Sequence, residues 1–234
     1  ELALKISKKL NDQLNIAKSY HHIAWIYKHI NNLDNSSRYF ENANKIYLRL
    51  NDKFGQTKCL IGFGTIYKEK GEMDKAIDSY SKVYDIAKNL DNQDGMATAL
   101  SHLGSTYMFC GELSKAIDCS HKSIKIYKKL NDNLAIGHNL LLLSHYHNFK
   151  DEYLKSSNYE KKAFKIFNDF GAKPQVADSF FSIANSLMYQ NKLLKSLKIY
   201  KDLIVTYDDL NDKGKSGHAK LFTGLLYTRM GAFS

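Results

Sequence analysis

Residues 103–117 of the chain read Leu-Gly-Ser-Thr-Tyr-Met-Phe-Cys-Gly-Glu-Leu-Ser-Lys-Ala-Ile, and this stretch decides the fold. A small residue, Gly104, is followed by Tyr107, which lies three positions later and about one helical turn away. Gly111 and Glu112 interrupt the run, and apolar residues resume at helical spacing after them. The stretch predicts the end of one helix, a tight turn and the start of a second helix.

The features of this stretch return every 40 residues along the chain. One ladder is the phrase Leu-Asn-Asp or a variant of it, which begins at Leu10, Leu50, Leu90, Leu130 and Leu210, with a weaker copy at Phe170. A second ladder is the small residue, present as Ala24, Gly64, Gly104, Ser144, Ala184 and Gly224. A third ladder, three residues further on, contains Tyr27, Tyr67, Tyr107, His147, Leu187 and Tyr227. Three ladders in one register predict an all-α solenoid of stacked helix-turn-helix repeats.

The period divides the chain into five full repeats, which cover residues 13–52, 53–92, 93–132, 133–172 and 173–212. Residues 1–12 match a second helix without its first, and residues 213–234 match a first helix without its second. A single helix pair of this size cannot bury a sufficient core, so neighbouring repeats have to supply the missing face. We therefore expect one solenoid over residues 1–234, and its incomplete ends indicate an excerpt of a longer chain.

Polar residues stand at the expected helix starts. Five of them precede the first helices of repeats and are expected N-caps: Asp12, Asp52, Asn92, Asp132 and Asp212. For the second helices, the same role is expected of Asp34, Asp74 and Ser114. The only proline, Pro174, falls at the start of an expected first helix, where its missing N–H costs least.

The combination of Leu103, Gly104, Tyr107, the Gly-Glu turn and Ala116 resembles the signature of the tetratricopeptide repeat. The long period is similar to that of the subgroup found in kinesin light chains, the spindle adaptor Pins and many bacterial signalling proteins. The resemblance implies a right-handed superhelix whose first helices line a concave groove for a peptide or protein segment. The fourth repeat departs most, because His147 and Glu160 stand where the family prefers aromatic residues, and we expect looser packing there.

Composition narrows the class of protein. The chain has 34 Lys and Arg against 24 Asp and Glu, which gives a formal net charge of +10. Its densest apolar run, Leu140–Leu143, is far shorter than a membrane span. The three cysteines, Cys59, Cys110 and Cys119, form no close pair, which favours a reducing compartment. We expect a cytoplasmic protein with no membrane partner.

The sequence contains no glycine-rich phosphate loop, no paired cysteines for zinc, no His-Glu-x-x-His and no Gly-x-Ser-x-Gly motif. We therefore expect no catalytic residue, cofactor or metal in this segment, and any enzymatic output domain would lie outside it. Seven histidines fall on the expected groove: His21, His22, His29, His102, His138, His145 and His218. Besides plain hydrogen bonding, this placement leaves open metal binding and a pH response near neutrality.

Counting from the small residue of each repeat gives the side chains that face the expected groove. The predicted peptide-binding residues are Lys18, His22, Trp25, Lys28, Lys58, Thr65, Lys68, His102, Ser105, Phe109, Leu142, His145, Phe181, Asn185, Met188 and Phe222. The set changes from basic to apolar along the chain, which predicts a ligand with acidic residues at one end and apolar anchors at the other. The alternative for each apolar side chain is packing between neighbouring helices. Of the asparagines that hold the ligand backbone in the Pins-like subgroup, only Asn185 is matched.

The leading hypothesis is a non-enzymatic scaffold that binds a protein or peptide, and the resemblance implies the sensory or interaction region of a bacterial signalling protein. One alternative is a basic solenoid that binds nucleic acid, although no base-reading module is present. Another is a homo-oligomer formed through the solenoid ends, where Leu221 and Leu225 lack a partner helix. Most of the lysines lie outside the expected groove, so the net charge says little about the ligand.

Overall fold

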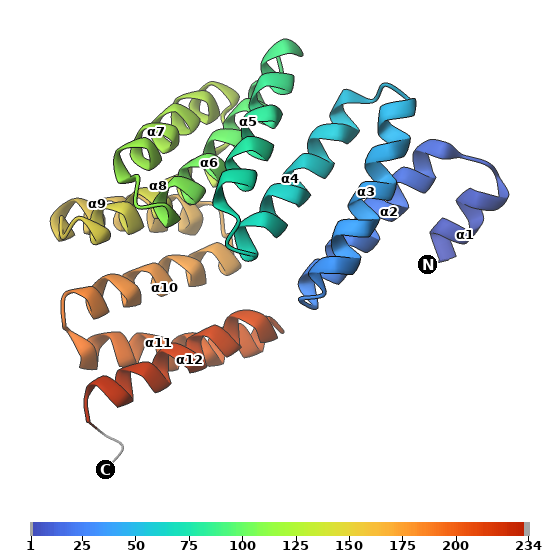
Figure 1. The fold of residues 1–234 in the computed structure, drawn as a ribbon. Helices are drawn as coiled ribbons and strands as arrows, with labels where there is room; N and C mark the ends of the chain where they lie inside the picture. Colours follow the sequence, from blue (N-terminus) through green and yellow to red (C-terminus); the bar gives the residue numbers. More distant parts are fainter. Residues whose placement is uncertain (1, 232–234) are drawn as a thin grey trace. The chain divides into compact units, whose positions relative to one another are not determined.

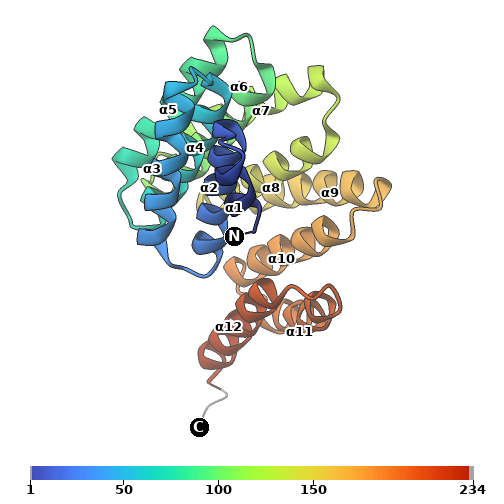
Figure 2. The same ribbon diagram turned by 90° about the vertical axis from the view of Figure 1, so that its right-hand side faces the viewer.

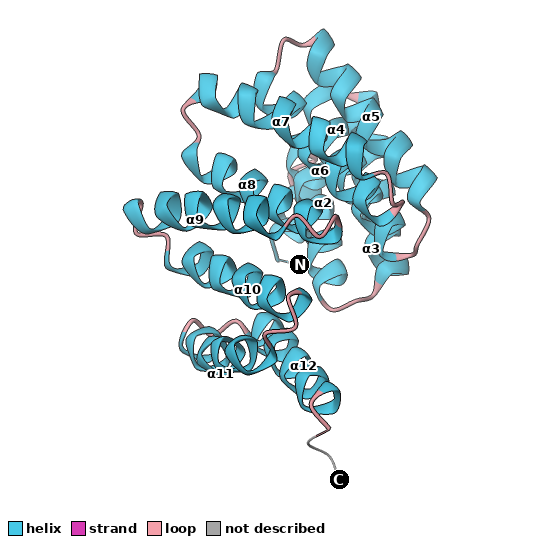
Figure 3. Ribbon diagram, turned by 90° about the vertical axis from the view of Figure 1, so that its left-hand side faces the viewer, coloured by secondary structure: helices cyan, strands magenta, loops and turns pink. Residues whose placement is uncertain are grey.

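The computed structural model describes residues 2–231 (Figure 1). Its helices are α1 (Leu2–Lys9), α2 (Gln13–His29), α3 (Leu33–Arg49), α4 (Lys53–Glu69), α5 (Met73–Asn89), α6 (Gln93–Phe109), α7 (Leu113–Leu130), α8 (Asn133–Phe149), α9 (Tyr153–Asp169), α10 (Lys173–Tyr189), α11 (Leu193–Asp209) and α12 (Lys213–Arg229). Over these residues the chain contains no strand, and short turns join the helices (Figure 3). The predicted all-α repeat fold is confirmed.

The helices form two compact units, residues 1–126 (unit 1) and residues 127–234 (unit 2). Within unit 1, each helix from α1 to α6 packs against the next one in the chain, and the first helices α2 and α4 also touch. Within unit 2, the same holds from α8 to α12, and the first helices α8 and α10 touch. Figure 2 shows α11 and α12 side by side in unit 2. The common 40-residue register predicts that all repeats join into one solenoid, and this stays a prediction.

Every turn between helices contains one residue with a positive φ, and these residues recur every 20 positions. They are Asn11, Asn31, Asn51, Gly71, Asp91, Gly111, Asn131, Asp151, Gly171, Asn191 and Asn211, followed after α12 by Gly231. At the end of α2, the Asn32 N–H donates to the Tyr27 carbonyl at 2.9 Å, and the Asn31 N–H donates to the Lys28 carbonyl at 2.9 Å. This hydrogen-bond pair closes a helix end around a left-handed residue, a conformation that Gly, Asn and Asp tolerate best.

The predicted caps are correct for the first helices and wrong for the second. Asp52, for example, accepts a hydrogen bond from the Gly55 N–H at 2.8 Å, and the equivalent residues cap α2, α6, α8 and α12. The N-cap of α3 is Asn32 instead of Asp34, which lies within the first turn. Asp74 and Ser114 likewise lie inside α5 and α7. The left-handed turn ends two residues earlier than we expected, so the next helix begins earlier too.

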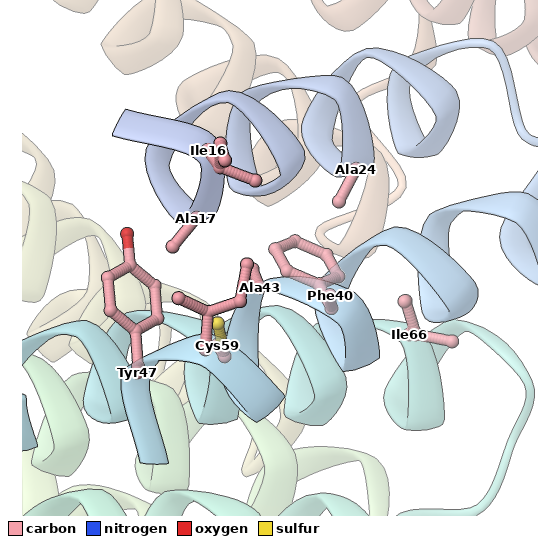
Figure 4. Packing of buried hydrophobic residues seen from close by; sticks show 9 residues of the cluster. Ile16, Ala17, Ala24, Phe40, Ala43, Tyr47, Cys59 and Ile66 are labelled. Carbon is pink, nitrogen blue, oxygen red and sulfur yellow. The ribbon is translucent and has the colours of Figure 1, made fainter. Parts of the chain in front are cut away.

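The core of unit 1 lies between the first and second helices of its repeats. Figure 4 shows Phe40 and Tyr47 of α3 beside the small residues of α2 and beside Cys59 of α4. Phe40 and Ala24 are fully buried, as the ladder of small residues predicts. At the matching position on α4, a Cβ added to Gly64 would lie 2.7 Å from the ring of Tyr80. In the first two repeats the small residue is therefore a close-packing position, and an aromatic ring of the following helix fills the space beside it.

Unit 2 contains a second core around Tyr200, Leu203 and Tyr207 of α11. These side chains pack against Ala184 of α10 and Leu226 of α12, and all five are at most 3% exposed. Each unit thus has an apolar core of its own, built from the same positions of the repeat.

The fourth repeat differs from the others at Glu160 of α9, which occupies the position of Phe40, Tyr80 and Tyr200. Its side chain is only 3% exposed. One carboxylate oxygen accepts hydrogen bonds from Ser144 at 2.9 Å, Ser156 at 3.4 Å and Ser182 at 3.5 Å. Burial raises the pKa of Glu160. A cluster of small hydroxyl side chains therefore surrounds a carboxyl group where the first, second and fifth repeats place a ring; the third repeat has Ser120 there.

The other departure in this repeat, His147, is also buried, and its ring stacks on Tyr159 at 5.3 Å. Its Nδ1 lies 2.6 Å from a carboxylate oxygen of Glu152. The looser packing that we expected in this repeat is thus not seen at its two exceptional residues, because polar contacts and stacking hold both of them.

None of the helices in residues 2–231 combines the length and the apolar character that a membrane crossing requires.

Candidate functional site

The first helices of unit 1 carry ten of the predicted peptide-binding residues. They are Lys18, His22, Trp25 and Lys28 on α2; Lys58, Thr65 and Lys68 on α4; and His102, Ser105 and Phe109 on α6. We call this set the first-helix face of unit 1. Lys18, His22, Lys58 and Phe109 are exposed, and the other six are half-buried. Helical spacing places them along one side of α2, α4 and α6.

A pocket of about 310 Å³ lies on this face between α2 and α4. It is lined by Lys18, His21, His22, Trp25, Tyr47, Lys58 and Ile61. The structure thus brings together four residues that the sequence analysis selected separately: Lys18, His22, Trp25 and Lys58. It adds Tyr47 of the second helix α3, which the sequence analysis missed because counting from the small residue covers first helices only.

His21 holds one wall of this pocket in place. The indole N–H of Trp25 donates to Nε2 of His21 at 3.2 Å. Burial, followed by electrostatic interactions with His22 and Lys58, lowers the pKa of His21 to about 4. The imidazole is therefore neutral near pH 7, and its unprotonated Nε2 can accept the hydrogen bond of Trp25.

Next to the pocket, the basic residues of the face already have partners. Lys28 forms an ion pair with Glu69 at 2.8 Å. Lys68 donates to the hydroxyl of Ser105 at 3.1 Å and lies 5.8 Å from the ring centre of Phe109. Burial lowers the pKa of Lys68. The exposed ammonium groups of the face, those of Lys18 and Lys58, thus lie at the pocket.

Thr65 and His102 meet at the buried Tyr80 of α5. The Thr65 hydroxyl lies 3.2 Å from the Tyr80 hydroxyl, and the imidazole of His102 stacks on the Tyr80 ring at 4.8 Å. Burial, followed by the charge of Lys68, lowers the pKa of His102 to about 4. These two residues connect the face to the core of unit 1.

In unit 2, the predicted residues are more involved in packing. Phe181 and Phe222 form aromatic contacts with each other at 5.5 Å and with Tyr200 at 5.3 and 5.4 Å, respectively. Asn185 is buried, and its side-chain oxygen accepts a hydrogen bond from the Tyr200 hydroxyl at 2.7 Å. Met188 packs against the same core. These four residues support the alternative of packing between helices.

The remaining two, Leu142 and His145, are half-buried on α8. Burial lowers the pKa of His145, and it also lowers the pKa of His138 on the same helix. Together with His21 and His102, four of the seven expected groove histidines thus become harder to protonate. This does not support a response to pH near neutrality from these four. Over residues 2–231, no three His, Cys, Asp or Glu side chains gather in a way that could hold a metal ion.

Comparison with known proteins identifies the repeat. One model of the tetratricopeptide repeat matches residues 17–50 and 57–90, and a second model of this repeat matches residues 96–135. The chain is a tetratricopeptide repeat protein. The matched segments end before most of unit 2, whose fourth repeat carries the exceptional His147 and Glu160. No curated protein matches the sequence.

Solved structures with the same fold include three proteins of low sequence identity. The first is a signal transduction ATPase with numerous domains and a tetratricopeptide repeat sensor from Pyrococcus horikoshii, with a TM-score of 0.66 and 19% identity over 94% of this chain. The second is a Rap protein in complex with Competence and Sporulation Factor, with a TM-score of 0.69 and 14% identity over 94% of this chain. The third is a set of putative kinesin light chain repeats from Podosopora anserina, with a TM-score of 0.62 and 12% identity over 83% of this chain.

The three structures differ in how much of them this chain represents. It spans 34% of the ATPase, 66% of the Rap protein and 95% of the kinesin light chain repeats. At these identities the comparison shows the shared fold.

Proposed function

We propose that this chain is a non-enzymatic scaffold that binds a peptide or protein segment on its first helices. The observation that carries the proposal is the pocket between α2 and α4, where basic and aromatic side chains of the first-helix face of unit 1 converge. Aromatic side chains are enriched at surfaces that recognise another chain, and charged groups beside them complement charges of the partner. The apolar first-helix residues of unit 2 would extend the site only where they remain accessible.

We further propose that the chain serves as the sensory or interaction region of a cytoplasmic bacterial signalling or regulatory protein. Two of the structural neighbours support this role, since one contains a repeat sensor and the other was solved with a bound factor. A bound ligand would act by favouring one arrangement of neighbouring repeats, which are connected mainly through nearest-neighbour contacts.

Selection from a random dodecapeptide display library tests the scaffold. We expect enriched peptides that bind the purified chain when they are synthesised. In hydrogen exchange, bound peptide should protect α2, α4 and α6 more than the second helices α3 and α5. The proposal fails if no peptide is enriched, or if protection falls on the second helices alone.

A further inference from the structure

The pocket between α2 and α4 is positively charged and has no acidic residue in its wall. Its rim contains two ammonium groups, Lys18 and Lys58, together with the exposed His22. Neither lysine forms an ion pair with a carboxylate of residues 2–231. Lys58 lies 4.4 Å from the ring centre of Phe54, a contact that leaves its charge uncompensated.

The acidic residues nearest to the pocket in the sequence serve the helix starts. Asp12 accepts hydrogen bonds from the backbone and side-chain nitrogens of Asn15 at 3.0 and 2.7 Å, and these bonds lower its pKa more than Lys18 does. Asp52 accepts the N–H of Gly55 as the cap of α4. Neither carboxylate forms an ion pair with Lys18 or Lys58, so both ammonium groups remain available to an anionic group of a ligand.

The inner walls of the pocket are apolar and aromatic. Trp25 is held by its hydrogen bond to His21, Tyr47 is 3% exposed, and Ile61 is half-buried. A volume of about 310 Å³ is at the lower end of the range of small-ligand pockets, which is about 300–1,000 Å³. The space suits one or two side chains of a bound segment, with an apolar part against Trp25 and a negative group between the two lysines.

From this geometry we infer that the pocket binds an acidic side chain of the ligand, Asp or Glu, together with an adjacent apolar side chain. The inference rests on the proposed function and adds the ligand chemistry at one end of the site. A carboxylate is favoured over the backbone of a nucleic acid because the cationic surface is small. A run of phosphates would need further unpaired lysines along the face. Of the next basic residues, Lys28 is paired with Glu69, and Lys68 is half-buried and donates to Ser105, so neither continues a row of exposed cations.

The peptides from the display selection test this inference directly. We expect Asp or Glu next to an apolar residue in the enriched peptides, and we expect their binding to change the fluorescence of Trp25, the only tryptophan of the chain. K58E and K18E should each weaken the binding of such a peptide at least about tenfold, because attraction becomes repulsion. A peptide with Lys in place of its acidic residue should recover binding to K58E.

The matched control is K45E, which makes the same charge change on the exposed side of the second helix α3, outside the pocket. It should leave the affinity within about twofold. The inference is overturned if the enriched peptides lack acidic residues, or if K58E and K45E weaken binding equally. In either case the proposed binding of peptides to the first helices would still hold. If no peptide binds at all, the proposed function fails together with the inference. Binding of a labelled 20-nucleotide oligothymidylate that K58E abolishes and that equals the peptide in affinity would also overturn it.

Discussion

Gly64 of α4 shows at the scale of a single residue why the small position of the repeat is needed. The ring of Tyr80 lies where a Cβ at this position would point, at a separation of 2.7 Å. Tyr80 is fully buried and cannot move aside without disturbing the contact of its hydroxyl with Thr65. The local packing therefore excludes even one additional methyl group.

The substitution Gly64→Ala should consequently destabilise the protein, even though alanine favours a helix more than glycine does. We expect a loss of about 1–3 kcal/mol in the free energy of unfolding, as is usual for overpacked cores. Gly224→Ala is the matched control, because Gly224 occupies the same position of the repeat and has open space beside it. It should be neutral or stabilising. Urea denaturation of both variants checks the difference, and equal losses would contradict the close-packing role of the ladder.

Glu160 gives a prediction about pH. Burial raises the pKa of its carboxyl in the folded state, so the folded protein binds this proton more tightly than the unfolded chain does. The stability that this proton contributes is complete below the pKa of the unfolded chain, about 4.3, and is lost as pH rises through the raised pKa of the folded state.

Glu160→Gln keeps an oxygen for the serine hydroxyls and removes the ionisation. Relative to the wild type, this variant should therefore gain stability as pH rises from about 4.3 to 8, with a slope of at most about 1.4 kcal/mol per pH unit. Denaturation curves at several pH values measure this gain. Glu41→Gln on the exposed surface of α3 is the control. If the free energy of unfolding depends on pH in the same way in Glu160→Gln and Glu41→Gln, the Glu160 carboxyl does not have a raised pKa in the folded state.

At the scale of the helices, the turns explain why one set of caps was predicted correctly and the other was not. The repeat period identified Asp52 and its equivalents because each is the last residue of the repeated Leu-Asn-Asp phrase or its variant. For α3, the same reasoning selected Asp34, a residue with good capping chemistry. The left-handed residue Asn31 ends the turn after α2, and α3 begins directly after its N-cap Asn32. Backbone geometry at the turn thus decided between two chemically suitable residues.

This correction can be tested by removing one carboxylate of each kind. Asp52→Ala removes the oxygen that accepts the Gly55 N–H and should cost about 1 kcal/mol of unfolding free energy. Asp74→Ala should cost only a few tenths, because Asp74 lies inside the first turn of α5 and only its charge favours the helix start. Asp52→Asn preserves an acceptor and should resemble the wild type. Thermal and urea denaturation would contradict this assignment if Asp74→Ala proved the more damaging change.

At the scale of the whole molecule, the two compact units have separate cores, so a destabilising substitution in one unit should leave the stability of the other unit unchanged. Gly64→Ala should accelerate amide exchange in α4 and α5 of unit 1, and exchange in α11 of unit 2 should change little, because repeats are stabilised mainly by their neighbours. Hydrogen exchange resolved by peptide mass measures both regions in one experiment. A uniform increase across both units would show that they unfold as one cooperative body.

The sequence by itself determined the repeat, because the residue types that a helix pair needs return with a period of 40 residues. They are small residues where helices cross closely, aromatic residues near them, and Gly, Asn or Asp at the left-handed helix ends. It also selected Lys18, His22, Trp25 and Lys58, four of the residues that line the pocket, since helical periodicity fixes which side chains share a face.

Only the tertiary structure decided which of those residues already have partners. Lys28 is paired with Glu69, and Lys68 is half-buried beside Ser105. Asn185 accepts a hydrogen bond from Tyr200, whereas Lys18 and Lys58 are exposed at the pocket beside Trp25 and form no ion pair with a described carboxylate. The burial of the Glu160 carboxyl could not be predicted from the sequence either, because its serine partners come from three helices. Periodicity describes one helix at a time, whereas burial and charge pairing depend on side chains that neighbouring helices bring together.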